Sequence, residues 1–254
     1  MKTFALTGAA SGIGAALSSQ LTHEGQRVIS VDIKDANIVA DLSTRSGRED
    51  AIDSVISLAP DGLDGFVPLA GLGSGAGHAA TLMTSLNFFG AVEMTEGLRP
   101  LLARNSGAIV MVSSNSSVMS SPDDPLIAPL LAGDEATALK IAEKETGLEY
   151  MIGKRALIYW LRRKAFDYGR DGIRINGVAP GPIDTPMVAS LRDTPGMMDA
   201  VKSLLSMTPF ERLGRPAEVA NTIRFLLNKE ASYISGTVIY VDGGYDAATR
   251  TDHL

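Results

Sequence analysis

The sequence has no cysteine, only three histidines, and no long apolar run among its 254 residues. Without cysteine the chain cannot form a disulfide, an iron–sulfur cluster, a cysteine nucleophile or a cysteine-ligated zinc site. The histidines, His23, His78 and His253, are far apart in the sequence, so we expect no metal site. The apolar runs are far shorter than the roughly 20 residues that span a membrane. The first run ends at Leu6 in a glycine-rich turn, unlike a signal peptide. We therefore expect a cytoplasmic protein with no membrane partner.

The chain also lacks an excess of positive charge. It has 23 lysines and arginines against 29 aspartates and glutamates, a formal net charge of −6. Such a chain does not have the basic surface by which proteins attract nucleic acids or anionic membranes. Hydrophobic residues make up 45% and charged residues 20%, which is typical of a packed globular protein and not of a disordered one. We therefore expect a folded protein that binds no nucleic acid.

Short apolar runs alternate with longer mixed segments along the whole chain. The runs lie at 3–6, 27–31, 64–69, 107–112, 173–178 and 237–241. Helix-length segments separate them, at about 47–59, 79–103, 150–169 and 216–228. Buried apolar strands alternating with helices are typical of βαβ units in a parallel sheet. The sequence predicts an α/β protein: a single Rossmann-fold domain over 1–254, with a doubly wound parallel sheet and helices on both faces.

Two segments do not fit this alternation. Residues 118–147 and 185–213 each follow a predicted strand and are punctuated by proline or glycine. Each is either an ordinary pair of connecting helices or part of a binding site, because long loops beyond strand ends often carry sites. We expect a substrate lid at 185–213 and an inserted segment at 118–147, a substrate wall or an interface element. Four methionines suit an adaptable apolar lid, although they would equally suit a core or a subunit contact: Met187, Met197, Met198 and Met207.

A glycine-rich turn follows the first predicted strand and opens a helical pattern. It reads TGAASGIG and contains Gly8, Gly12 and Gly14. Glycines let the backbone approach a pyrophosphate, and the helix N-terminus supplies free N–H groups. Asp32 ends the second strand, where a carboxylate accepts hydrogen bonds from a ribose diol and repels a 2′-phosphate. The pattern predicts a preference for NAD over NADP. The positive charge of Lys34 would weaken that preference. The alternative is that the glycine-rich turn and the aspartate at the strand end are ordinary structural features that bind no ligand.

Tyr150 and Lys154 stand four residues apart, on one face of a predicted helix. A free phenol, with a pKa of about 10, is a poor base at neutral pH. A nearby ammonium and the positive charge of an oxidised nicotinamide would lower that pKa, as a general acid/base requires. Ser114 would hold the reacting oxygen by a hydrogen bond. The alternative is a chance pair of residues on one helix face.

These motifs together resemble the short-chain dehydrogenase/reductase family over nearly the whole chain. The resemblance rests on TGAASGIG at 7–14, LAGLG at 69–73, SLNFFGA around Asn87, and IVMVSS ending at Ser114. It continues with YMIGK at 150–154, RINGVAPGPIDTPM at 174–187, RLGRPAEVA at 212–220 and GTVIYVDGG at 236–244. So many motifs, in order and at compatible spacing, make a chance match improbable.

The resemblance implies a role for each matching residue. Tyr150 would be the catalytic acid/base, and Lys154 would lower its pKa and bind the nicotinamide ribose. Ser114, rather than Ser113, would orient the substrate, and Asn87 would hold a proton-relay water with Lys154. Besides Asp32, Tyr150 and Lys154, the implied cofactor-binding residues are Gly8, Ser11, Gly12, Ile13, Gly14, Asp41, Leu42, Ala70, Gly71, Pro180, Gly181, Ile183 and Thr185.

The chain departs from the family pattern at three places. Leu69 replaces a usual asparagine, which puts local strand support in doubt, and Gly153 stands where a small residue, often serine, is common. Tyr150 follows Ser114 by 36 residues, farther than usual, because of the 118–147 segment. This insertion makes the chain similar to the bacterial 3α-hydroxysteroid dehydrogenase/carbonyl reductase branch.

That branch implies an NAD-dependent oxidoreductase acting on a lipophilic, cyclic secondary alcohol, hydroxysteroid- or terpenoid-like, and its ketone. One alternative is an aryl or allylic alcohol dehydrogenase of the coniferyl-alcohol type. Another, of a different class, is a nucleotide-sensing protein without chemistry. The resemblance also implies a homodimer or a homotetramer.

Overall fold

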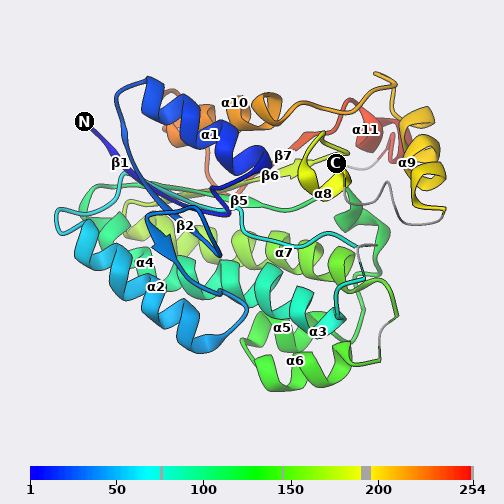
Figure 1. Cartoon of the computed structure of the whole chain (residues 1–254), viewed down its shortest axis with the longest axis horizontal. Helices are drawn as coiled ribbons and strands as arrows, with labels where there is room; N and C mark the ends of the chain where they lie inside the picture. Colours follow the sequence, from blue (N-terminus) through cyan, green and yellow to red (C-terminus); the bar gives the residue numbers. More distant parts are fainter. Residues whose placement is uncertain (75–76, 145, 190–195, 253–254) are drawn as a thin grey trace.

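The computed structural model describes residues 1–74, 77–144, 146–189 and 196–252. Its centre is a seven-stranded parallel sheet in the order β3-β2-β1-β4-β5-β6-β7 (Figure 1). The strands are β1 (Thr3–Thr7), β2 (Arg27–Asp32), β3 (Ile38–Val39), β4 (Gly65–Pro68), β5 (Ala108–Val112), β6 (Arg174–Pro180) and β7 (Val238–Val241). The prediction of a single-domain, doubly wound sheet is confirmed. β3 is a strand that the apolar pattern did not reveal.

Helices cover both faces of the sheet. On one face lie α1 (Gly12–His23) and α10 (Pro216–Leu227), and on the other α2 (Arg45–Leu58), α4 (Ala91–Arg104) and α7 (Glu149–Arg170) (Figure 1). Successive residues of a strand point to opposite faces, and β5 shows the consequence. Val110 and Val112 belong to the core beneath α1 and α10, whereas Ile109 and Met111 belong to the core beneath the other helices. This is why β5 is apolar throughout.

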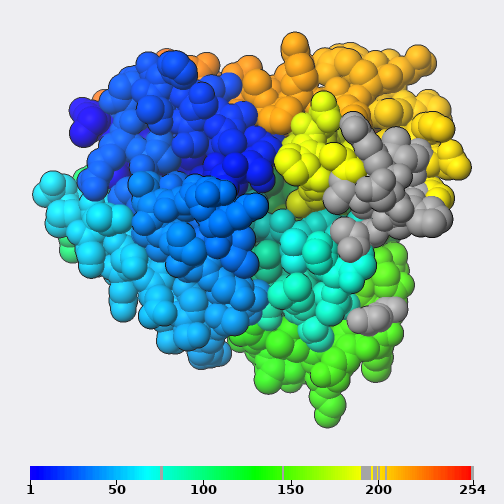
Figure 2. All heavy atoms as spheres, viewed as in Figure 1, coloured from blue at the N-terminus to red at the C-terminus, as the bar shows by residue number. Residues whose placement is uncertain are grey.

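The segment 118–147 forms two short helices, α5 (Ile127–Ala132) and α6 (Glu135–Ala142). α5 packs against α7, and α6 packs against α3 (Ala80–Thr84). In the space-filling view these green residues form a lobe beside the cyan ones (Figure 2). Pro129 is tolerated inside α5 because it lies in the first turn, where backbone N–H groups have no partner within the helix.

Three further short elements surround the carboxyl edge of the sheet. They are α8 (Pro186–Ala189), α9 (Met197–Ser206) and α11 (Tyr245–Thr249). The predicted helix over 79–103 is divided into α3, a π-helical turn at Ser85–Gly90 and α4. Within the described ranges, no helix combines the length and the apolar character needed to cross a membrane.

Candidate active site

A cavity of about 630 Å³ crosses the carboxyl edge of the sheet. It is lined by the loops that follow β1 to β6, and the strand order reverses between β1 and β4. Open α/β sheets bind ligands at such a reversal. All the residues predicted to bind the cofactor or to react line this cavity, except Asn87. They are Gly8, Ser11, Gly12, Ile13, Gly14, Asp32, Asp41, Leu42, Ala70, Gly71, Ser114, Tyr150, Lys154, Pro180, Gly181, Ile183 and Thr185.

The loop after β1 owes its shape to close contacts between backbone segments. A Cβ atom on Gly14 would lie 2.0 Å from the carbonyl oxygen of Gly8, and one on Gly8 would lie 2.6 Å from the amide nitrogen of Ala70. That Ala70 amide donates a hydrogen bond of 3.0 Å to Thr7 Oγ1. No side chain fits at either glycine, so the backbone itself borders the cavity. This leaves room for a ligand to approach the amides of the loop.

The N-terminus of α1 is left open for a ligand. Ser11 occupies the N-cap, yet its side chain makes no capping hydrogen bond with any described residue. By contrast, α2 is capped by Thr44, whose hydroxyl accepts a 3.1 Å hydrogen bond from the amide of Gly47. Uncapped N–H groups at a helix N-terminus favour an anion, since the helix dipole is positive there. The geometry fits the pyrophosphate of a dinucleotide.

Asp32 is anchored at the end of β2 with both oxygens positioned. Oδ2 accepts a 2.9 Å hydrogen bond from the Ala10 amide, and Oδ1 accepts one of 2.7 Å from the Ile33 amide. A carboxylate has about four acceptor sites, so capacity remains for hydroxyl donors. Asp32 therefore links the phosphate loop to a site that suits a ribose diol. Lys34 lines the same part of the cavity.

The loop after β3 forms the end of the cavity farthest along the sheet from β6. Asp41 Oδ1 accepts hydrogen bonds from the amide and the hydroxyl of Ser43, at 2.9 and 2.6 Å. Leu42 is buried, and all three residues line the cavity. The side chain of Asp41 thus shapes its own loop as well as bordering the ligand space.

The reactive side chains gather at another part of the cavity, where β5 ends beside α7. Lys154 Nζ donates a 2.9 Å hydrogen bond to the Val112 carbonyl and lies 5.7 Å from the ring centroid of Tyr150. Ser114 hydrogen-bonds Tyr150, and its Oγ also accepts a hydrogen bond of 3.2 Å from the Ser116 amide. The structure therefore brings together the three residues that the sequence singled out for proton transfer.

Burial shifts the pKa values of this group. It raises the pKa of Tyr150 above its usual 10, while the hydrogen bond with Ser114 acts in the opposite direction. Burial lowers the pKa of the Lys154 ammonium from 10.5 to about 8. Both shifts disfavour the charged forms, because the surroundings solvate charge poorly. In the protein alone Tyr150 is therefore a protonated phenol, ready to donate.

Asn87 lies in the π-helical turn at 85–90 and is buried. Its amide pairs with the backbone of Leu72: Nδ2 donates to the carbonyl at 2.9 Å, and Oδ1 accepts from the amide at 2.8 Å. A Cβ on Gly71 would meet both Asn87 Oδ1, at 3.0 Å, and Lys154 Nζ, at 4.0 Å. Asn87 thus supports the loop beside Leu69, and its role in a proton relay stays a prediction.

The two irregular segments differ in their relation to the cavity. Thr185 to Val188 line it, and a Cβ on Gly12 would lie 3.1 Å from Thr185 Cγ2. None of the cavity-lining residues belongs to the described part of 118–147. Met207 is exposed, while residues 190–195 and the side chains of Met197 and Met198 lie outside the described part of the chain. The substrate lid at 185–213 stays a prediction.

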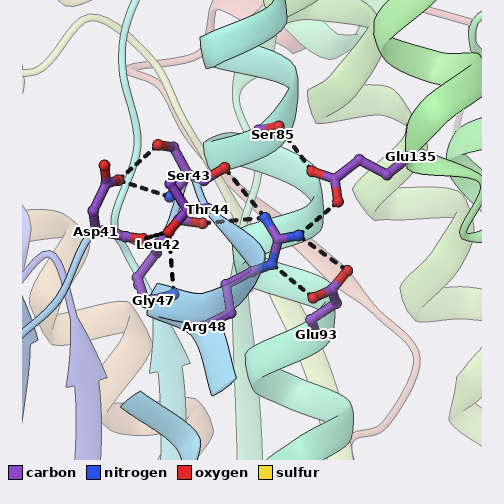
Figure 3. Close-up of polar contacts among 9 residues, drawn as sticks. All are labelled: Asp41, Leu42, Ser43, Thr44, Gly47, Arg48, Ser85, Glu93 and Glu135. Atoms are coloured by element: carbon purple, nitrogen blue, oxygen red, sulfur yellow. Dashed lines mark hydrogen bonds and ion pairs between the residues drawn. The ribbon is translucent and has the colours of Figure 1, made fainter. Parts of the chain in front are cut away.

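Sequence reasoning missed several residues of the site. Ser113, named only as the alternative to Ser114, has a contact that was not foreseen: it donates a 2.7 Å hydrogen bond to the Lys154 carbonyl, which ties β5 to α7. His78, Leu82 and Leu86 line the cavity, and their four-residue spacing was a signal that could have found them. Arg48 is fully buried behind the loop after β3, and the sequence contains no such signal for it, because its two carboxylate partners lie far away in the sequence (Figure 3).

Comparison with known proteins agrees with this geometry. The family model described as short chain dehydrogenase matches residues 2–126, and one described as enoyl-(acyl carrier protein) reductase matches residues 136–246. The 3-alpha-hydroxysteroid dehydrogenase/carbonyl reductase of Comamonas testosteroni is 36% identical, with 98% of each chain covered. The cis-4-hydroxycyclohexanecarboxylate dehydrogenase of Sinomonas cyclohexanicum is 31% identical, with 95% of each chain covered.

A solved structure is similar as well. The 3-alpha-hydroxysteroid dehydrogenase from Pseudomonas sp. B-0831, crystallised in complex with NADH, is 38% identical. The match covers 99% of this chain and 100% of that one, with a TM-score of 0.94. The chain belongs to the short-chain dehydrogenase/reductase family. The resemblance inferred from its motifs is confirmed, and so is the prediction of an oxidoreductase of this family.

Proposed function

We propose that the protein is an NAD-dependent oxidoreductase that interconverts a lipophilic, cyclic secondary alcohol and its ketone. The observation that carries the proposal is the single cavity that joins Asp32 and the uncapped α1 to Ser114, Tyr150 and Lys154. One part offers a carboxylate and free amides to a dinucleotide, and the other offers a phenol and a hydroxyl to a reacting oxygen. A relative that acts on a hydroxysteroid and one that acts on a hydroxycyclohexane carboxylate support a cyclic substrate.

The proposed cofactor fits the residues present. Gly8 and Gly14 leave the backbone bare beside the cavity, and the N-terminus of α1, where the Ser11 side chain makes no capping hydrogen bond, faces a pyrophosphate in this proposal. The anchored carboxylate of Asp32 would accept from the adenosine ribose hydroxyls and repel a 2′-phosphate. The NADH bound to the Pseudomonas relative supports NAD as the cofactor. When bound, the nicotinamide supplies the hydride acceptor or donor and, in its oxidised form, a positive charge.

The chain's own residues handle the proton and orient the substrate. In ketone reduction the Tyr150 hydroxyl donates its proton to the carbonyl oxygen, and in alcohol oxidation the phenolate takes that proton back. Ser114 donates a hydrogen bond that holds the same oxygen. Lys154 stabilises the phenolate, since an opposite charge nearby favours the ionised form of a phenol. The backbone carbonyl of Val112 fixes the Lys154 ammonium in place.

Apolar side chains support a lipophilic substrate. Leu72, Leu82, Leu86, Met187 and Val188 line the same cavity as Tyr150. Burial of apolar surface against such side chains is the main source of affinity for a hydrophobic ligand. We therefore favour a bulky cyclic alcohol over a small or polar one.

The test combines a substrate panel with Tyr150→Phe. The parent protein is assayed with NAD or NADP and steroid, terpenoid, cyclohexanol and cinnamyl-type alcohols, by the absorbance of the reduced nicotinamide. We expect turnover with NAD on a bulky cyclic alcohol. Tyr150→Phe should bind NADH like the parent and lose at least about 100-fold in turnover, the contribution of a general acid/base.

Each part of the proposal has its own contrary result. Turnover retained by Tyr150→Phe would refute the acid/base role. A preference for NADP would refute the proposed role of Asp32 in excluding a 2′-phosphate. Activity confined to cinnamyl-type alcohols would show that the substrate is an aryl or allylic alcohol and not a cyclic secondary one. NADH binding without turnover of any alcohol in the parent would favour a nucleotide-sensing protein.

The same proposal includes a homodimer or homotetramer in the cytoplasm. α5 packs against α7, so it covers part of the surface of that helix. Light scattering on the purified protein measures the assembly directly, and a monomer at assay concentrations would contradict this part.

A further inference from the structure

Arg48 is a fully buried arginine with every side-chain nitrogen engaged (Figure 3). Nε donates to Glu93 Oε2 at 2.6 Å, and Nη2 donates to Glu135 Oε2 at 2.6 Å. Nη1 lies 3.4 Å from the backbone carbonyls of Leu42 and Ser43. A buried guanidinium requires neutralising partners, and here two carboxylates from separate helices supply them.

The two carboxylates come from different parts of the chain. Glu93 belongs to α4, whereas Glu135 is the first residue of α6, within the inserted segment. The second oxygen of Glu135 accepts a 2.8 Å hydrogen bond from the hydroxyl of Ser85. Asp134 caps α6 by accepting a hydrogen bond from the Thr137 amide at 3.1 Å, which fixes the turn that carries Glu135. Glu135 is thus an oriented, mostly buried partner of Arg48.

The loop that Arg48 contacts has little freedom elsewhere. On the side of α4, a Cβ added to Gly90 would come 3.2 Å from the Leu42 carbonyl oxygen. At the start of α2, a Cβ on Gly47 would come 2.1 Å from the Asp41 carbonyl oxygen. Arg48 therefore holds from behind a short, tightly packed loop whose front, Asp41 to Ser43, borders the nucleotide end of the cavity.

We infer that Glu135 is a positioning residue for the nucleotide site, acting through Arg48 on the loop of residues 41–43. This inference rests on the proposed function, because it assumes that the cavity holds a dinucleotide. Without the Glu135 charge the guanidinium keeps one carboxylate partner and shifts toward Glu93, away from the Leu42 and Ser43 carbonyls. The inserted segment, which lines none of the described cavity, then contributes to cofactor affinity at a distance.

The experiment compares Glu135→Gln with Ala138→Gly. The first variant keeps the shape of the side chain and an acceptor for Ser85 but removes the charge that faces Arg48. The second weakens the same helix one turn later, at a buried residue that has no part in the network. NADH binding is followed by its fluorescence, and kcat and KM are measured with the cofactor varied. The melting temperature of each variant is recorded.

We expect Glu135→Gln to weaken NADH binding and raise the KM for NAD roughly tenfold, with kcat at saturating cofactor unchanged. ADP, which carries the adenine half alone, should lose affinity by the same factor, because the loop lies at that end. Ala138→Gly should bind NADH with the affinity of the parent, even if its melting temperature is lower.

Two results would overturn the inference. One is NADH binding by Glu135→Gln within twofold of the parent. The other is a loss of affinity in both variants that follows only their loss of melting temperature, which is the signature of a merely structural role. A parent protein that fails to bind NADH would instead refute the proposed function, so the two failures are distinguishable.

Discussion

The glycine loop at 8–14 and helix α7 border the same cavity but are constrained in opposite ways. At Gly14 an added Cβ would meet a backbone oxygen at 2.0 Å, whereas at Gly153 no atom of the described chain outside the helix's neighbouring backbone lies within 4 Å. Conversely, the loop contains no ionisable residue, while α7 carries Lys154, a lysine whose pKa burial lowers to about 8. Steric packing fixes the conformation of the loop, whereas in the helix burial of a charged group sets the pKa of Lys154.

The difference teaches where each kind of substitution acts. Under the proposed function the loop contributes its backbone, so added volume there removes cofactor binding directly. Helix α7 contributes side chains under the same proposal, and we expect the backbone between them to tolerate change. Three substitutions test this contrast.

Gly14→Ala should have the largest effect. Its Cβ meets the carbonyl carbon and oxygen of Gly8, which belong to the backbone and have no rotamer by which to move aside. We expect a loss of about 3 kcal/mol or more in the free energy of unfolding, together with loss of NADH binding. Urea unfolding and NADH fluorescence measure the two effects. Near-parent stability and binding would show that the loop is not held by packing.

Lys154→Met should change how stability depends on pH. The folded protein releases the Lys154 proton near pH 8, whereas the unfolded chain keeps it to about pH 10.5. Between these values the unfolded chain binds more protons, so Lys154 makes the free energy of unfolding rise with pH. The rise is at most about 1.4 kcal/mol per pH unit. Urea unfolding of cofactor-free protein between about pH 7.5 and 9.5 should show this rise in the parent and not in the variant. Identical slopes would contradict the burial of the charge.

Gly153→Ala should have the smallest effect and the opposite sign. Alanine is the better helix former, and the space beside Gly153 accepts a methyl group. We expect the free energy of unfolding to rise by up to about 1 kcal/mol, with NADH affinity unchanged. Thermal unfolding and the NADH titration used for Gly14→Ala provide the matched comparison. A loss of stability would mean that α7 is as tightly constrained as the loop.

Much of the fold was predictable because buried parallel strands leave a strong sequence signal. All six predicted apolar runs correspond to strands, since both faces of the sheet are covered by helices. β3 has only two residues and was missed, because its pairing with Val31 and Asp32 is decided by the chain that surrounds it. The division of the predicted 79–103 helix by the turn at Ser85–Gly90 was missed for a similar reason: the pattern stays helical throughout.

The candidate site was predictable where a motif lies on one element. The Gly8–Gly14 loop and the Tyr150–Lys154 pair are local patterns, and the structure places both at one cavity. The hydrogen bonds of Asn87 with Leu72 and of Ser113 with Lys154 were not predictable, because each joins residues from separate elements.

The sequence by itself determined the alternation of strands and helices, the glycine loop and the spacing of the tyrosine and lysine. These depend on periodicity and backbone freedom, which act between near neighbours in the chain. Only the tertiary structure decided the surroundings of the side chains. It buries Lys154, which lowers the pKa of that lysine, and it places two carboxylates around Arg48. Glu93 and Glu135 lie 45 and 87 residues from Arg48. Such an ion-pair network exists only after packing excludes water from groups that are remote along the chain.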